Sequence, residues 1–178
     1  MYSDLRTVQL FNNDGTLYTT TSRDVLRDCG ERIRLLKTVT EYDSLSTKLK
    51  SELISNMLEA SFANVPDVVA PFLDSEPDLW VGGRALEIKT ARTPHTWRGG
   101  EYSKRESDYL MVSYDDSDDG WKWFVLHTYL KESDWKSSGS SSYYATTIDM
   151  NHIIENTPYT ILVGDTVKKK VKYHVICS

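Results

Sequence analysis

The segment 74–92, DSEPDLWVGGRALEIKTAR, places two short apolar runs on either side of a glycine pair at 82–83. Glycine adopts a positive φ at no steric cost, so two consecutive glycines favour a two-residue hairpin turn. Counting outward from this turn places Asp78 directly opposite Glu87. The sequence therefore predicts a β-hairpin that brings two carboxylates together.

The two faces of this hairpin differ in character. Directly opposed residues point to the same side of a sheet, with Cβ atoms about 5 Å apart, so Asp78 and Glu87 share one face. Lys89 lies two residues beyond Glu87 and joins them, because side chains alternate along a strand. The opposite face is apolar and is expected to enter the core; its residues are Leu79, Leu86 and Ile88.

Two interpretations of this charged cluster stay open on the residues alone. Like charges that directly oppose each other destabilise a sheet, so a divalent cation between Asp78 and Glu87 would account for the pair. Mg²⁺ prefers oxygen ligands, polarises a phosphate and lowers the pKa of an attacking water. Lys89 would then stabilise the charge that develops on the phosphate. The alternative is a solvent-exposed face with a weak ion pair and no chemistry.

The same residues resemble a known signature. Pro77-Asp78, eight intervening residues and then Glu87-Ile88-Lys89 are similar to the motif of the PD-(D/E)xK nuclease superfamily, which includes many type II restriction endonucleases and related repair nucleases. A preceding amphipathic helix and the strong strands that follow extend the resemblance over about residues 45–130. The resemblance implies an α/β (α+β) fold with a restriction-endonuclease-like core, in which a mixed central β-sheet is flanked by helices.

The resemblance also implies a role for each residue of the motif. In this superfamily the two acidic residues bind the metal, which would be Mg²⁺, and these roles fall on Asp78 and Glu87. The backbone carbonyl between the motif's Glu and Lys often completes the ligand set, and that position is Ile88. Lys89 would be the catalytic lysine.

The helix before the motif often supplies a further catalytic glutamate in this superfamily. Glu52 and Glu59 are the candidates, since they lie seven residues apart and therefore on nearly one face of a helix. The small residue Ser55 stands one turn before Glu59, which resembles a small-xxx-Glu pattern seen in relatives and favours Glu59. For either glutamate the alternative is a solvent-exposed helix face.

A basic stretch follows the motif. Residues 84–105 hold six basic side chains and two acidic ones, in a chain that is acidic overall. Arg98 is followed by two glycines that allow a close backbone approach, and it is a candidate reader of base edges. The alternative is a solvated loop. The candidate DNA-binding residues are Arg92, His95, Arg98, Lys104 and Arg105.

Elsewhere the sequence predicts helices first and then a mostly β body, which indicates an α+β or mixed α/β arrangement in a single domain, 1–178. Apolar positions at helical spacing predict the second helix, and they are Leu45, Leu49, Leu53, Met57 and Ala60. The predicted helices cover 21–39 and 44–60. The predicted strands cover 6–11, 108–114, 121–130 and a final pair at 160–165 and 167–176.

Composition narrows the class of protein. The 178 residues carry a formal net charge of −5, so DNA would have to bind to a local basic surface rather than to the protein as a whole. No apolar run approaches the ~20 residues of a membrane span, and the N-terminus lacks the apolar core of a secretory signal. Cys29 and Cys177 lie far apart, which indicates free thiols in a reducing cytoplasm.

These features lead us to expect a Mg²⁺-dependent, sequence-specific endonuclease of the type II restriction kind. It would hydrolyse phosphodiester bonds in double-stranded DNA as a homodimer, because a two-fold pair of active sites suits a palindromic target. Two alternatives stay open. One is a nicking or structure-specific repair and recombination nuclease of the same superfamily, and the other is a DNA-binding module without enzymatic activity.

Overall fold

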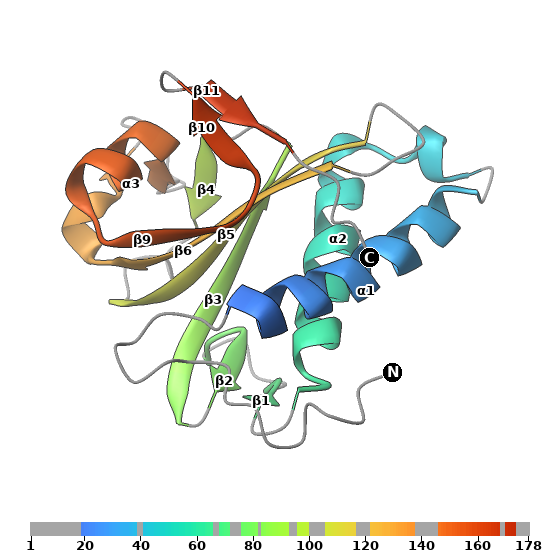
Figure 1. Ribbon diagram of the computed structural model, residues 1–178, viewed down its shortest axis with the longest axis horizontal. Helices are drawn as coiled ribbons and strands as arrows, with labels where there is room; N and C mark the ends of the chain where they lie inside the picture. Colours follow the sequence, from blue (N-terminus) through green and yellow to red (C-terminus); the bar gives the residue numbers. More distant parts are fainter. Residues whose placement is uncertain are drawn as a thin grey trace.

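The structure is a computed structural model (Figure 1). The predicted strand at 6–11 lies outside the residues that it describes, as do His95, Lys104 and Arg105. The described residues are 19–38, 41–65, 68–71, 76–81, 83–92, 96–99, 106–116, 122–137, 146–167 and 170–173.

A six-stranded mixed sheet forms the centre of the protein, with the strand order β1-β2-β3-β5-β6-β9. Neighbouring strands are antiparallel except for β3 and β5, which are parallel, so the predicted mixed sheet is confirmed. The strands are β1 (Val68–Val69), β2 (Leu79–Val81), β3 (Arg84–Ala91), β5 (Ser107–Asp115), β6 (Lys122–Leu130) and β9 (Tyr159–Val163).

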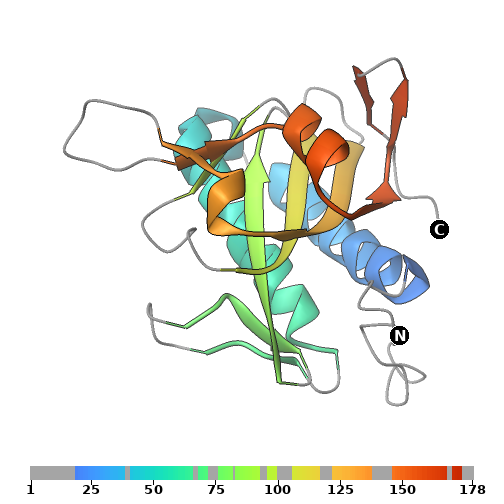
Figure 2. The same cartoon turned by 90° about the vertical axis from the view of Figure 1, so that its left-hand side faces the viewer.

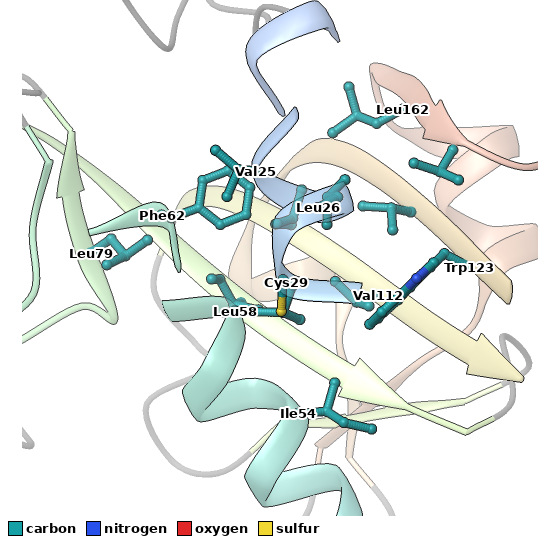
Figure 3. Close-up of a cluster of buried hydrophobic side chains, with 14 of the residues drawn as sticks. Val25, Leu26, Cys29, Ile54, Leu58, Phe62, Leu79, Val112, Trp123 and Leu162 are labelled. Atoms are coloured by element: carbon teal, nitrogen blue, oxygen red, sulfur yellow. The ribbon is translucent and has the colours of Figure 1, made fainter. Parts of the chain in front are cut away.

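Two helices cover one face of this sheet (Figures 1 and 3). They are α1 (Thr19–Lys37) and α2 (Thr47–Phe62), and they contact each other. The side chain of Ser46 caps α2 by accepting a hydrogen bond from the backbone N–H of Leu49, at 3.2 Å. This cap satisfies one of the free N–H groups at the start of the helix.

The buried stripe of α2 differs from the predicted one. Ile54, Leu58 and Phe62 are fully buried, whereas Leu49 is 51% exposed and Ala60 is also exposed. The other predicted positions, Leu45, Leu53 and Met57, are only partly buried against the core. The predicted spacing was right but its phase was wrong, because two stripes with helical spacing compete in this sequence and only packing against the sheet selects one.

A second layer covers the other face of the sheet. It consists of a small three-stranded sheet, β4-β8-β7, and the short helix α3 (Figure 2). Trp97 anchors this layer, since its fully buried indole Nε1–H donates a hydrogen bond of 2.9 Å to the backbone carbonyl of Val112. The elements are β4 (Trp97–Gly99), β7 (Lys136–Ser137), β8 (Thr146–Ile148) and α3 (Met150–Asn156).

The last strands pair differently from the prediction. β9 joins the edge of the main sheet through β6, with Thr128 opposite Tyr159. The residues that follow form their own hairpin, β10 (Asp165–Val167) with β11 (Lys170–Lys172). Hydrophobic alternation located these strands in the sequence but could not identify their partners. The remaining described helices are the short 3₁₀ turns Tyr42–Ser44 and Glu132–Asp134.

A hydrogen-bonded triad around the buried carboxylate of Asp108 links β3, β5 and β6 on the helical side of the sheet. Asp108 is 2% exposed and accepts two hydrogen bonds from the Arg84 guanidinium, at 2.6 and 3.0 Å. His127 lies on the neighbouring strand, with its Nε2 atom 2.8 Å from Asp108. A buried carboxylate requires such partners, so His127 is a packed strand residue that stabilises Asp108. None of the described helices combines the length and the hydropathy needed to cross a membrane.

Variants in the two stripes of α2 should differ in their free energy of unfolding. Leu58→Ala should lower the free energy of unfolding by about 2–5 kcal/mol, because it leaves a cavity in a packed core. Leu49→Ala in the same helix is the matched control and should change it by less than about 0.5 kcal/mol. Urea denaturation followed by circular dichroism measures both values. Similar losses in the two variants would contradict the assigned buried face.

Candidate active site

The glycine turn gives the register that the sequence predicted. Leu79 pairs with Leu86 and Val81 pairs with Arg84, so the loop holds two residues. Gly83 is exposed and has a φ of 82°, a conformation that residues with a Cβ rarely adopt. The register therefore places Asp78, the residue just before β2, opposite Glu87 on β3.

A hydrogen bond fixes the carboxylate of Asp78 at the edge of β3. Its Oδ2 atom accepts from the backbone N–H of Ile88 at 2.7 Å. β2 pairs with β3 only over residues 84–86. The Asp78 side chain, just before the first residue of β2, therefore continues the hydrogen bonding along the edge of β3. The N–H and C=O of one residue in an extended strand point to the same edge, so the Ile88 carbonyl also lies at this edge.

Glu87 is 7% exposed and lies within the electrostatic reach of Asp78 and Lys89. Burial raises the pKa of its carboxyl to about 7, and the negative charge of Asp78 adds to this rise. The ammonium of Lys89 and the backbone N–H of Asp78 act in the opposite direction. The pair is therefore strained when both acids are ionised and nothing positive lies between them.

The helix α2 brings a third carboxyl to the same place. Burial raises the pKa of Glu59 to about 7, the charge of Asp78 raises it further, and Lys89 and a hydrogen bond to Ser55 lower it. Glu59 therefore lies close to both hairpin residues. Glu52, seven residues earlier on α2, is exposed and forms a 3.9 Å ion pair with Lys48.

The donor atoms at this edge suit a hard cation. Asp78, Glu87 and the backbone carbonyl of Ile88 offer only oxygen, which Mg²⁺ prefers. Among the described residues no group of three or more His, Cys, Asp and Glu side chains is arranged as a ready metal site. Mg²⁺ is commonly held by one or two carboxylates together with waters and substrate phosphate oxygens, so these ligands fit it. A cation would also relieve the strain between the two acids.

The predicted DNA-binding residues lie in several places. Arg92 follows β3, is exposed, and contacts Asp116 at 3.6 Å. Arg98 is exposed in the middle of β4, between the buried Trp97 and Gly99, so it belongs to a strand and not to a solvated loop. The remaining candidates, His95, Lys104 and Arg105, lie outside the described part of the chain.

The sequence did not indicate that Arg98 has a companion. In the small sheet Arg98 pairs with Thr147, and Thr147 pairs with Lys136 on its other side. These directly opposed residues share the outer face, where Arg98 and Lys136 are exposed. Each cation follows a buried tryptophan in the chain, Trp97 or Trp135, and this repeated Trp-cation pair is the signal that could have identified the row.

No protein-family model matches the chain, and no curated protein matches it either. Among solved structures the chain is similar to a restriction endonuclease in complex with substrate DNA. The two chains are 15% identical, the comparison covers 80% of this chain and 86% of that chain, and the TM-score is 0.44. A similarity at this level assigns no function, so the function has to be inferred from the site's own residues.

Glu87→Gln should stabilise the metal-free protein at alkaline pH. The folded-state pKa of Glu87 is raised from 4.5 to about 7, so ionising it costs stability as the pH rises through that interval. In EDTA above about pH 7 the variant should exceed the wild type by on the order of 1–3 kcal/mol, and the difference should shrink below about pH 4.5. Chemical denaturation across this pH range measures it, and a less stable variant at alkaline pH would refute the assigned strain.

Proposed function

We propose that this protein is a Mg²⁺-dependent endonuclease that hydrolyses phosphodiester bonds in DNA. One arrangement supports the proposal: Asp78 is hydrogen-bonded to the edge of β3, and the charges of Asp78 and Lys89 act on both Glu87 and Glu59. The hydrogen bond from Ile88 to Asp78 holds the first acid there, and burial brings Glu87 and Glu59 to pKa values near 7. Strongly perturbed acids beside a lysine are typical of catalytic sites.

Each residue has a distinct task in this proposal. Asp78, Glu87 and the Ile88 carbonyl would hold Mg²⁺, which supplies Lewis-acid polarisation of a phosphate and a lowered pKa for a bound water. Lys89 donates hydrogen bonds to the phosphate and stabilises its developing negative charge. Glu59 has a pKa of about 7, so it can accept a proton from an attacking water at neutral pH.

The local positive charge favours a polyanionic substrate, although the protein as a whole carries a net negative charge. Lys89, Arg92, Arg98 and Lys136 lie on β3, at its end, or on the small sheet of the adjoining layer. Phosphate contacts position DNA, whereas contacts to base edges give specificity. The finer proposal is sequence-specific cleavage of double-stranded DNA by a homodimer of the type II restriction kind, with Arg98 as a candidate base reader.

Cleavage assays with site variants test this function. Wild-type protein should cut phage DNA in Mg²⁺, and Lys89→Ala or Asp78→Asn should lower the rate by about 100-fold or more, because each removes charge that the transition state needs. Glu59→Gln should also be slow. Glu52→Gln is the matched control from the same helix and should retain the wild-type rate, since Glu52 faces solvent.

The pattern of products separates the related functions. Discrete fragments with defined ends support a restriction activity. Nicks in supercoiled plasmid or cleavage of branched DNA would indicate a structure-specific nuclease with the same site. A wild-type protein that cuts no DNA in Mg²⁺ or Mn²⁺ would refute the proposal, and a DNA-binding module would then be the remaining alternative.

Metal binding can be measured without cleavage. Mg²⁺ or Ca²⁺ should raise the melting temperature of the wild type, because the ion binds the folded state alone and adds about 2.7 kcal/mol at 100 times its Kd. Asp78→Asn should abolish this rise while its amide oxygen still accepts the Ile88 hydrogen bond. Glu52→Gln should behave as the wild type. An equal rise in all three proteins would place the ion elsewhere.

A further inference from the structure

An apolar row crosses the strands beside the candidate active site. Val69 on β1 pairs with Trp80 on β2, and Trp80 pairs with Ala85 on β3. Directly opposed residues point to the same side, so these three side chains share one face. The next pair along these strands, Val68 with Val81, points the other way and is buried in the core.

This row lies outside the hydrophobic clusters of the described residues. Val69 is 60% exposed, and Trp80 and Ala85 are half-buried. The neighbours of Trp80 in β2, Leu79 and Val81, are buried and hold the strand in place. Figures 1 and 2 show β1 and β2 at the end of β3 that lies away from the small sheet, so the described part of the second layer does not cover them. Trp80 is thus a large aromatic side chain that stays partly exposed on this face.

The row is adjacent to the catalytic acids on the same face. Trp80 lies two residues after Asp78, and Ala85 lies two residues before Glu87. A strand advances about 3.4 Å per residue, so the two rows are about 7 Å apart. A phosphate held by Lys89 and by a cation on the acids would therefore bring the group attached to it onto Trp80.

We propose that Trp80, flanked by Val69 and Ala85, is a binding subsite for the deoxyribose and base edge of the nucleotide attached to the scissile phosphate. The inference rests on the proposed nuclease function and names a substrate contact of the same site. The polarity of the surface matches that of a nucleotide: charged groups for the phosphate lie at one end, and a flat apolar surface for the sugar and base lies beside them. Aromatic side chains contact nucleotides in this way without requiring a given base.

The size of the row favours this occupant over a protein partner. A stable protein interface buries about 800 Å² on each partner, which three side chains cannot supply. The two rows are about 7 Å apart, which matches the size of one nucleotide. The subsite would act on substrate position, so Trp80 is a binding residue and takes no part in bond breaking.

Tryptophan fluorescence tests the contact directly. The other tryptophans in the described residues, Trp97, Trp123 and Trp135, are buried. Adding a short duplex oligonucleotide with Ca²⁺ in place of Mg²⁺, so that a cation still joins the acids to the phosphate, should change the emission of the wild type. Trp80→Phe should lose most of that change and still bind the duplex in a gel-shift assay. Wild-type and Trp80→Phe proteins that respond alike would overturn the inference.

Steady-state kinetics separates a subsite from a structural role. Trp80→Ala should raise KM for DNA by roughly 5- to 100-fold with a smaller effect on kcat, because a base–aromatic contact is worth about 1–3 kcal/mol. Trp80→Phe should restore most of the affinity. Tyr159→Ala, which truncates a 40% exposed aromatic on the opposite edge strand β9, is the matched control and should leave KM unchanged.

The outcomes separate this inference from the proposed function. If the wild type cleaves DNA and Trp80→Ala has an unchanged KM, the subsite is wrong and the nuclease function stands. If no cleavage occurs but duplex still changes the Trp80 emission, the nucleotide contact stands and the nuclease function fails. A Trp80→Ala protein that self-associates less than the wild type, at unchanged KM, would assign the row to a second copy and overturn the inference.

Discussion

The candidate site depends on one hydrogen bond, between the backbone N–H of Ile88 and the carboxylate of Asp78. β2 begins only at Leu79, and among the described residues no strand pairs with β3 on this side beyond Leu86. The Asp78 side chain takes the place of the missing strand. This hydrogen bond therefore satisfies the backbone N–H of Ile88 and directs the Asp78 carboxylate towards Glu87. The geometry of the site thus depends on the open end of the hairpin.

The site stores electrostatic strain that the rest of the fold has to offset. Glu87 is buried, Glu59 is partly buried, and both lie near the charge of Asp78. Lys89 compensates only part of this repulsion. The core that opposes it is large: the helices α1 and α2 bury an apolar cluster against the central sheet, including Ile54, Leu58 and Phe62 (Figure 3). Such a local cost is typical of functional sites, where a binding partner relieves it.

Helix α2 serves both the core and the site. One stripe of the helix packs on the sheet, and Glu59, one residue after the fully buried Leu58, reaches the edge of β3 beside Lys89. The position of this acid is therefore set by the packing of the apolar stripe. On the neighbouring strand β2, Trp80 faces away from the core because Leu79 and Val81 face into it.

The sequence by itself determined the hairpin, its register and the face shared by Asp78, Glu87 and Lys89, because a glycine turn and strict alternation are local properties of the chain. The long strands β5 and β6 were predictable from their nearly continuous apolar runs, which are also a local property. Only the tertiary structure decided that Glu59 and not Glu52 lies at the site, that Arg98 belongs to a strand beside Lys136, and that β9 pairs with β6. Each of these outcomes depends on which elements pack against each other. The periodicity of a helix or strand shows which of its faces is apolar, but it does not show which element that face will contact.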